Sequence, residues 1–465
     1  MTEGQAGRSE SLPLAPAQET LWEFVKYFAP ENPSHAGMNV VGSVRIPEEI
    51  EPTAFRSAVA DLARRHDALR TVFVRTGVDP LLRVAARMAP AVSFHDLSPL
   101  TDEVRTRRRY ELVDRAATAT FDLLQGPLWK VVVIRTAAKD HLIVVTLFHL
   151  VADGHSVGLF LADLKAAYQA RRGLGPRPPA PATRYWEAAA RRRRDVAAAA
   201  DGIRQWAGRL LPLAETLPFP VLDRSAVSPE SAVAKHVHMF PDGFPDELLA
   251  FGRRARTTPF MVLLGAYAVL LSLRTGWDRV VIGSTTAGRD LPGTGRVIGQ
   301  FTNNVYLDMR VLPHLTLLEV TGQAHARMRE ATRFAASFKA IARAVHPRFD
   351  EERPWPFVHL FHGWFQAAPP RAEARFPEYG DDHAELSLER VAAAPAPSYD
   401  GSLTWIRRGA PGVIISGDRR AAMVSYDPRF FAREMVRELM EQYGALVRRM
   451  LLDPSRPVKE FGHLV

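Results

Sequence analysis

The 465-residue sequence contains no cysteine. This absence excludes disulfide bonds, thiolate metal ligands and a cysteine nucleophile. An enzyme with this sequence therefore cannot form a thioester on a side chain of its own, and we expect no metal ion in its site. Because disulfides mark oxidising compartments, the absence also favours a cytoplasmic location.

Long apolar runs are also missing. No stretch of about 18 or more uncharged apolar residues occurs, so the sequence predicts no membrane-spanning segment. Residues 1–14 lack the apolar stretch of a signal peptide and are expected to form a short disordered tail. The patterns G-x-G-x-x-G and G-x-x-x-x-G-K are absent too, which argues against a bound nucleotide.

Basic residues are in excess, with a formal net charge of +9 and a pI of about 9.9. Such charge can attract nucleic acid, but here the arginines are mostly scattered among alanine and proline, and no helix-turn-helix pattern stands out. The one dense cluster, Arg191–Arg194, lies in an alanine-rich helical stretch. We favour a solvated helix face for this cluster over docking of an acidic protein partner, and we expect no nucleic-acid partner.

Helical and strand patterns alternate along both halves of the chain. The sequence predicts helices at 16–28, 51–66, 102–118, 156–172, 258–274, 316–335 and 428–451. It predicts strands at 38–46, 69–75, 128–136, 140–148, 279–286, 303–311 and 357–365, with a hairpin at 412–418 and 421–427. The segment 173–183 is rich in proline and glycine and predicts a linker between the halves. Two such halves predict an α/β fold of two layers, each a sheet covered by helices.

The segment from Leu147 to Ser156 carries the residues best suited to chemistry. An apolar strand ends, His149 follows at once, and a short loop leads into a helix. Strand ends combine a rigid scaffold with an open site, and an imidazole can accept a proton near neutral pH. Asp153 can hold the loop through an ion pair, Gly154 allows a tight turn, and Ser156 suits the N-cap of the helix. Alternatively, His149 merely satisfies a backbone group at a strand end.

Motifs along almost the whole chain favour the chemical interpretation. The segments LAPAQETLW (14–22), RRHDALRTVF (64–73), FDLLQGPLW (121–129), FHLVADGHS (148–156), IGSTTAGRD (282–290) and IGQFTNNV (298–305) follow one another at characteristic spacings. In order and spacing they resemble the conserved motifs of the condensation domains of nonribosomal peptide synthetases.

The resemblance implies a role for each matching residue. His149 takes the place of the catalytic second histidine of the motif H-H-x-x-x-D-G-x-S. Asp153 matches a structural aspartate, which in the family pairs with the arginine matched by Arg289. Gly154 matches a glycine whose backbone N–H lies near the reacting centre, and Asn303 matches an asparagine that lines the site.

The fold implied by the resemblance has two chloramphenicol-acetyltransferase-like subdomains, arranged as a V-shaped pseudo-dimer with a central tunnel. The first subdomain would span residues 15–175 and the second residues 176–465. Carrier domains would dock at the two mouths of the tunnel.

The sequence also departs from the family pattern. Phe148 replaces the first motif histidine, at a position that packs inward in the family. The segment 399–405 lies where a D-F-G-W-G-like motif is expected but does not match it. Residues 356–365 occupy the region of the missing R-D-x-S-R-N-P-L motif. Phe148 bears on catalysis, whereas the two missing motifs concern the acceptor side more than the fold.

The implied activity is that of a free-standing condensation enzyme of natural-product biosynthesis. It would transfer an acyl group from a carrier-protein thioester to an amine or hydroxyl acceptor. No L-G-G-x-S carrier motif and no adenylation motif occur, so substrates would arrive in trans. The phosphopantetheine arm of a carrier would be substrate, and we expect the enzyme itself to bind no cofactor and to be a monomer. Two alternatives are a polyketide-associated or wax-ester-type O-acyltransferase that uses carrier or coenzyme A thioesters, and a non-catalytic recruitment domain.

Other polar and aromatic residues receive structural interpretations. His155 fills a variable motif position and is expected to line the tunnel or face solvent. The stretch from His362 to Trp364 suits a packed strand end as well as an acceptor site. Tyr185 and Trp186 follow the linker and are expected to anchor it.

Overall fold

The computed structural model describes most of the chain. The described residues are 11–28, 38–76, 80–208, 210, 234–333, 336–345, 361–367, 412–416, 418–426, 428 and 431–465. The segment 399–405 lies outside the described residues, as does the stretch 356–360.

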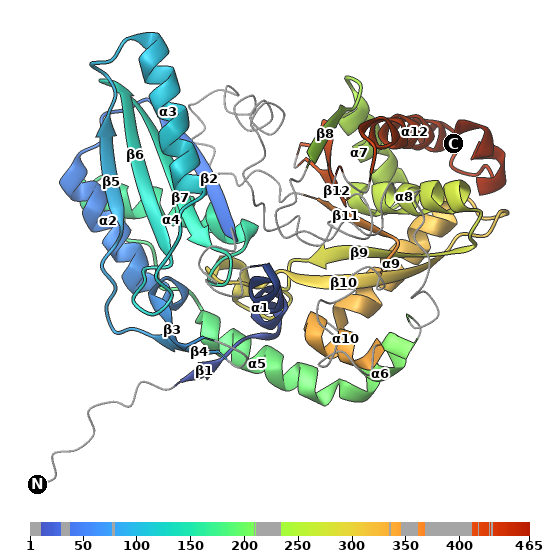
Figure 1. Cartoon of the computed structure of the whole chain (residues 1–465), viewed down its shortest axis with the longest axis horizontal. Coiled ribbons are helices and arrows are strands. Elements are labelled where there is room, and N and C mark those ends of the chain that lie inside the picture. Colours follow the sequence, from blue (N-terminus) through green and yellow to red (C-terminus); the bar gives the residue numbers. More distant parts are fainter. Residues whose placement is uncertain are drawn as a thin grey trace, which may run out of the picture.

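The first lobe is built from the N-terminal elements (Figure 1). Its helices are α1 (Pro16–Phe28), α2 (Pro52–Arg65), the 3-10 helix η2 (Asp67–Arg70), α3 (Asp102–Ala117) and α4 (Gly154–Arg171). Its strands are β1 (Leu12–Pro13), β2 (Asn39–Ile46), β3 (Thr71–Arg75), β4 (Leu81–Val84), β5 (Val92–Asp96), β6 (Trp129–Ala137) and β7 (Asp140–Phe148). They form a four-stranded sheet in the order β2-β7-β6-β5 and a small sheet β1-β4-β3.

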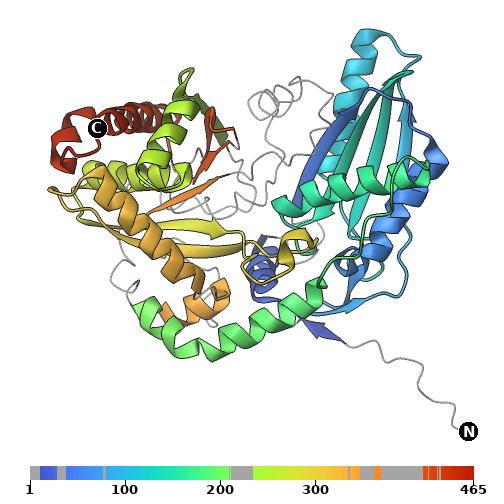
Figure 2. The ribbon, with the colours of Figure 1, turned by 180° about the vertical axis from the view of Figure 1, so that it is seen from behind.

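Helices cover both faces of the four-stranded sheet. Helix α3 lies on one face, where Leu112 and Ala116 pack with Val132, Ile134 and Val144. Helices α2 and α4 lie on the other face, as Figure 2 shows. Because β7 is covered on both sides, its stretch from Leu142 to Phe148 is apolar except for Thr146. Its C-terminal end points toward the second lobe (Figure 1).

The second lobe is larger. Its helices are α5 (Tyr185–Ala198), α6 (Ala200–Gly208), α7 (Phe244–Arg254), α8 (Pro259–Thr275), α9 (Leu317–Arg333), α10 (Phe338–Val345), α12 (Arg433–Leu452) and the 3-10 helices η4 (Thr294–Arg296) and η7 (Val458–Leu464). Its strands are β8 (Ala234–Met239), β9 (Arg279–Thr286), β10 (Asn303–Arg310), β11 (Gly363–Ala367), β12 (Gly412–Ile415) and β13 (Ala421–Tyr426). They form one sheet in the order β10-β9-β11-β12-β13-β8.

Helix α8 is the central helix of this lobe. Eleven of its 17 residues are buried. It packs against α7, α9 and α12 and against strands β9 and β11. A helix that is apolar all round must be buried on all sides, and these elements supply the cover.

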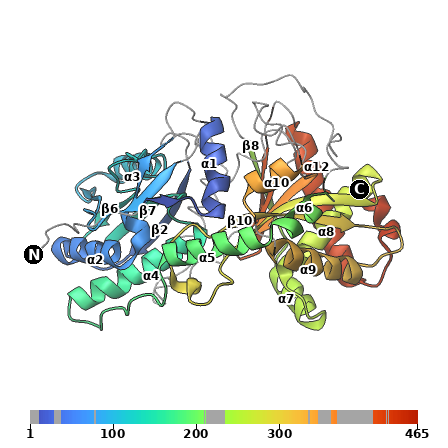
Figure 3. The same ribbon diagram turned by 90° about the horizontal axis from the view of Figure 1, so that it is seen from below.

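Two helices connect the lobes. Helix α5 runs along the base of the V from the first lobe toward α6 and α10, as Figures 1 and 3 show. Helix α1 lies at the junction and contacts α10 and β10 of the second lobe as well as α5. The N-terminal segment therefore belongs in part to the packing of the second lobe.

Most of the expected elements are present, but some differ. Residues 69 and 70 belong to η2, β11 begins only at Gly363, and α12 begins at Arg433. The sequence did not predict β8, whose stretch AKHVHM carries little apolar alternation because it lies at the sheet edge and is only half-buried. It also missed β4 and β5, which are short, and helices α6, α7 and α10. Residues 1–14 were expected to be a disordered tail, but Leu12 and Pro13 form β1, which pairs with β4, so this prediction was wrong at its C-terminal end. The division at residues 175 and 176 stays a prediction.

The connection from β9 to β10 reaches toward the first lobe and folds back on itself. Gly288 has a φ of +62°, and a Cβ at this position would overlap the carbonyl oxygen of Phe301. Only glycine combines a left-handed backbone with this close approach. Gly288 therefore fixes the place of the next residue, Arg289, in the connection.

We predict that Gly288→Ala lowers the free energy of unfolding by about 3 kcal/mol or more, because it combines backbone strain with a collision against backbone. The matched control is Gly276→Ala, where φ is +70° but no atom lies within 4 Å of the new Cβ. The control should lose only the strain of the left-handed residue, about 1 kcal/mol. Urea denaturation of the three proteins measures both values, and equal losses would contradict the collision.

Candidate active site

His149 lies directly after the last residue of β7. Its backbone N–H donates to the carbonyl of Met38 at 2.7 Å, which ties the strand tip to the residue before β2. The imidazole is partly exposed. Its Nδ1 atom is buried and has no hydrogen-bond partner among the described residues. The side chain is thus held at a strand end with one ring nitrogen enclosed.

The loop after His149 is held by a residue that sequence reasoning missed. Gln18 of α1 is fully buried, and its Nε2 donates to the carbonyl of Leu150 at 2.6 Å. Its Oε1 accepts from the N–H of Ala15 at 2.9 Å, which fixes the amide orientation. The motif LAPAQETLW contains Gln18, but only the tertiary fold shows that it contacts the His149 loop.

Asp153 begins helix α4 as its N-cap. Its Oδ1 accepts from the backbone N–H of Ser156 at 2.8 Å, and the helix itself starts at Gly154. The prediction that Ser156 is the N-cap was therefore wrong. A carboxylate caps a helix as well as a hydroxyl does, and Asp153 stands three residues earlier, at the spacing that capping requires.

Arg289 pairs with this carboxylate across the lobe junction. Its Nη2 donates to Oδ1 of Asp153 at 2.9 Å and to Oδ2 at 3.1 Å. The pairing that the family resemblance implies is thus present. Arg289 Nη1 also donates to the carbonyls of Thr294 and Val297, and its guanidinium lies 4.4 Å from the ring centre of Phe301.

Burial and charge act in opposite directions on Asp153. Burial of the fully enclosed carboxyl raises its pKa, but attraction to Arg289 and hydrogen bonds from Ser156 outweigh this effect. The pKa of Asp153 is therefore held below its ordinary value. The carboxylate stays ionised at neutral pH, so the ion pair persists.

The segment 299–302 closes the junction from the second lobe. The N–H of Phe301 donates to Oδ2 of Asp153 at 3.1 Å. The hydroxyl of Ser156 lies 2.7 Å from Asp153 Oδ1 and 2.9 Å from the carbonyl of Gly299, and it accepts from the N–H of Gly299 at 3.1 Å. Ser156 is therefore a bridge between the lobes.

The remaining motif residues take structural positions. Phe148 is fully buried and packs beside Phe121, so it points inward, as the corresponding family position does. Asn303 is buried, and its amide donates to the carbonyl of Ala336 at 2.9 Å while its Oδ1 accepts from the N–H of Asn304. These bonds hold the segment before α10, and a role for Asn303 in lining the site stays a prediction.

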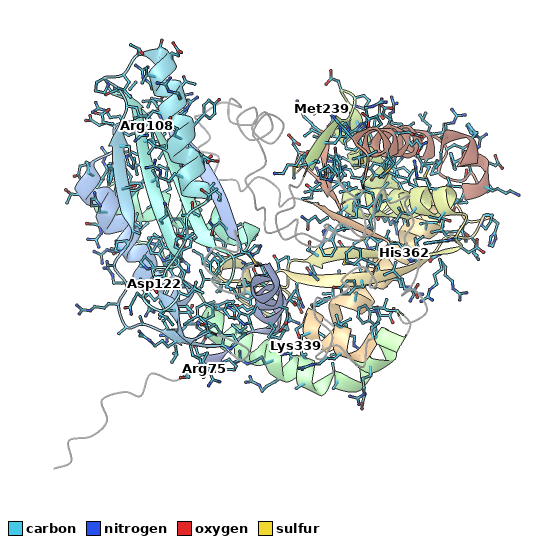
Figure 4. The ribbon with its side chains drawn as sticks, viewed as in Figure 1. Arg75, Arg108, Asp122, Met239, Lys339 and His362 are labelled. Carbon is cyan, nitrogen blue, oxygen red and sulfur yellow. The ribbon has the colours of Figure 1, made fainter. Side chains whose placement is uncertain are left out.

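Two histidines outside the motif core have structural bonds. His155 is exposed and its Nε2 lies 3.1 Å from the carbonyl of Gly295. His362 is buried, and its Nδ1 accepts from the N–H of Val281 at 3.0 Å. Burial, and next the charge of Arg279, lower the pKa of His362 to about 4. Figure 4 places His362 at the end of the second sheet that lies away from the first lobe, which favours the packed strand end.

The arginine cluster on α5 is only partly a solvated face. Arg192 forms an ion pair with Asp290 of the β9–β10 connection, and Arg193 donates to the carbonyl of Pro13 at 3.1 Å. Arg191 and Arg194 are exposed. The two inner arginines therefore join α5 to its neighbours, an outcome that the run of like charges did not indicate.

The described residues contain no group of three or more acidic or histidine side chains arranged to hold a metal ion. No single helix among them is long and apolar enough to cross a membrane; only α7 and α8 taken together, bent by 98°, pass that test of length and composition.

The arrangement as a whole presents one imidazole on a braced loop. The charges of Asp153 and Arg289 are used in their mutual contact, whereas Nδ1 of His149 has no hydrogen-bond partner among the described residues. A catalytic role for His149 stays a prediction. The first residue of α4, Gly154, contributes a backbone N–H at the positive end of a helix.

Comparison with known proteins agrees with this description. Residues 8–367 match the Condensation domain family. A linear gramicidin synthase of Brevibacillus parabrevis is 26% identical over 458 residues, which is 97% of this chain and 9% of that protein. The chain spans less than a third of the length of each of the first curated relatives that it matches.

Solved structures share the fold. The SgcC5 protein of Streptomyces globisporus matches with a TM-score of 0.70 and 22% identity, over 96% of this chain and 100% of that one. The X-domain solved as a complex with OxyB from teicoplanin biosynthesis matches with a TM-score of 0.72 and 19% identity, over 98% of this chain and 96% of that one. The fold is that of two chloramphenicol-acetyltransferase-like subdomains. With its motif histidine on a braced strand tip and a family match over most of its length, this chain belongs to the condensation-domain family.

Proposed function

We propose that this protein is an acyltransferase that moves an acyl group from a carrier-protein thioester to an amine or hydroxyl acceptor, forming an amide or an ester. The observation that carries this proposal is His149, a partly exposed imidazole at the end of β7 in a loop tied to both lobes. A thioester is already activated, so the enzyme needs no nucleophile of its own. It must hold the two substrates in line, and it must accept one proton and pass it on.

The burial of His149 Nδ1 decides which ring nitrogen can act. Because Nδ1 is enclosed, Nε2 is the nitrogen that a substrate can reach. In the neutral tautomer with its proton on Nδ1, Nε2 carries a free lone pair. It can then accept the proton of the attacking amine or hydroxyl, or hydrogen-bond that group into line with the thioester carbonyl. A general base contributes roughly 10²–10⁴-fold in rate.

The N-terminus of α4 suits the charge that develops on the carbonyl oxygen. When the acceptor attacks, the oxygen of the tetrahedral intermediate becomes negative, and backbone N–H groups stabilise such an oxyanion. The N–H of Gly154 lies in the first turn of α4. The preceding residue, Asp153, is ionised, but the charge of Arg289 compensates its negative charge. The thiolate leaves with its pantetheine arm and takes the proton that the imidazole has received.

Family membership supports the choice of a carrier-bound donor. Condensation domains work with carrier domains in nonribosomal peptide synthesis. The net charge of +9 is compatible with acidic carriers. We therefore propose carrier proteins as partners, with the phosphopantetheine arm as part of the substrate.

We predict that His149→Ala lowers turnover by about 10²–10⁴-fold, because the variant loses the proton acceptor and keeps the fold. The matched control is His155→Ala, an exposed histidine in the first turn of α4, which should stay within about twofold of the parent rate. Intact mass spectrometry of acyl-loaded carriers incubated with candidate amines and alcohols measures both. Near-parental turnover by His149→Ala would remove this residue from the mechanism.

The same assay separates the proposal from its alternatives. An acyltransferase of the wax-ester type would accept coenzyme A thioesters as readily as carrier thioesters, whereas we expect the carrier-bound donor to be preferred. A recruitment domain would bind a partner protein tightly and give no turnover with any donor. That last result would overturn the proposal.

We predict that Arg289→Met lowers the free energy of unfolding by about 3–5 kcal/mol, because it strands the buried charge of Asp153. The double variant Asp153→Asn with Arg289→Met should be more stable than Arg289→Met alone, since no buried charge remains. Urea denaturation of the parent, the two single variants and the double variant completes a double-mutant cycle. If Arg289→Met were as stable as the parent, the ion pair would not brace the junction.

The pH dependence of stability offers a second measurement of the same pair. Because the folded pKa of Asp153 is lowered, its contribution is complete above the unfolded pKa of about 4 and is lost as the pH falls through the folded value. Between about pH 5 and pH 3, the parent should therefore lose more stability than the double variant. Parallel acid profiles of the two proteins would contradict the lowered pKa.

A further inference from the structure

We propose that Tyr185, at the start of helix α5, is a positioning residue that sets the active loop through the segment 299–301. The inference rests on the proposed function, since it takes His149 as the catalytic group whose place must be held. Tyr185 follows the linker and is nearly fully buried. It touches the second-lobe side of the junction and not His149 itself.

The first contact is a hydrogen bond. The Tyr185 hydroxyl donates to the carbonyl of Gln300 at 2.9 Å. Burial, and next the charges of Asp153 and Asp67, raise the pKa of Tyr185 well above its ordinary value. The phenol therefore keeps its proton at neutral pH and remains a donor.

The second contact is steric. The Tyr185 ring lies so close to Gly299 that a Cβ on this glycine would overlap it. The same ring meets Phe301 edge-on, with the ring centres 5.1 Å apart. Tyr185 therefore contacts three consecutive residues, Gly299, Gln300 and Phe301.

Two of these three residues, Gly299 and Phe301, bond directly to the active loop. Gly299 exchanges hydrogen bonds with the hydroxyl of Ser156, and the N–H of Phe301 donates to Asp153. A shift of the segment by a fraction of a hydrogen-bond length would therefore move both ends of the Asp153–Ser156 turn. His149 stands four residues before Asp153 in the same short loop.

The backbone of Tyr185 is fixed from the first lobe. Asp67 is buried, and its two carboxylate oxygens accept from the N–H groups of Tyr185 and Trp186 at 3.1 and 3.3 Å. The Trp186 indole donates to the hydroxyl of Thr71 at 3.1 Å. Trp186 thus anchors α5 to the first lobe, while Tyr185 reaches across to the second. Figure 3 shows α5 running between the two.

The neighbouring aromatic residue provides a matched control. Tyr185→Phe removes only the hydroxyl and its bond to Gln300. Trp186→Phe removes the bond to Thr71 from the same turn of the same helix, but leaves the contacts with residues 299–301 in place. A general loss of helix anchoring would affect both variants alike, whereas positioning of the loop is specific to Tyr185.

Amide hydrogen exchange followed by mass spectrometry tests this difference without any substrate. In Tyr185→Phe we expect peptides covering 149–156 and 299–303 to exchange about 2- to 10-fold faster, the range expected for the loss of one hydrogen bond. Trp186→Phe should leave these peptides unchanged and loosen 67–73. Equal effects of both variants on 149–156, or no effect of Tyr185→Phe, would overturn the inference.

A reciprocal substitution tests the steric contact. Gly299→Ala should disturb the junction by collision with the ring, and Tyr185→Leu should relieve that collision. We expect exchange at 149–156 in the double variant to return toward the value of Tyr185→Leu alone. Additive effects of the two substitutions would show that the contact does not couple them.

Kinetics with a productive carrier-bound donor give a third measurement. Tyr185→Phe should lower kcat about 3- to 10-fold with KM within about twofold, because the reacting centre is misplaced while substrate binding is retained. A change in KM alone would contradict positioning. If the parent protein gives no turnover with any donor but the exchange results hold, the proposed function fails and the control of the loop by Tyr185 stands.

Discussion

The buried carboxylate of Asp153 is the constraint on which the rest of the site depends. It is fully enclosed, so every hydrogen-bond partner it needs must come from the protein. Those partners come from three places: the first turn of α4, the side chain of Arg289 and the segment of Phe301 and Thr302. Separating Arg289 from Asp153 would leave the buried charge without its counter-ion. The bonds of this one carboxylate therefore fix the position of the His149 loop relative to the second lobe.

Around this carboxylate, the junction holds its backbone with buried polar groups that come from distant parts of the chain. Gln18 holds the carbonyl of Leu150, Met38 holds the N–H of His149, and Ser156 bridges to Gly299. The interiors of the two lobes are largely apolar by comparison. Polar contacts are directional, whereas apolar packing tolerates small shifts. Placing them at the junction fixes the relative position of the lobes where the chemistry requires it, a form of preorganisation.

The sequence predicted the regular elements better than the contacts between them. Strand β9 has the bounds predicted for it, Arg279 to Thr286, and β7 ends where its apolar run ends. The N-cap of α4 was misassigned because local rules accept both Asp153 and Ser156, and only the fold shows that the serine hydroxyl is used across the junction. Tyr185 meeting Gln300, and Gln18 meeting Leu150, join residues 115 and 132 positions apart. No local pattern encodes such pairs. The pairing of Asp153 with Arg289 was available only through the family resemblance.

A single imidazole can suffice for catalysis only if its position is determined closely. Positioning alone contributes roughly 7–11 kcal/mol in favourable systems, more than a general base supplies. A thioester donor needs little activation, so the rate depends more on how the reacting groups are positioned than on catalytic side chains. The proposed activity therefore fits a site with one imidazole and a large supporting structure. Phe148 is compatible with the proposed activity, because it is buried beside Phe121 and serves packing. In the proposed mechanism the groups that hold His149 matter most, and they lie in both lobes and in the helix between them.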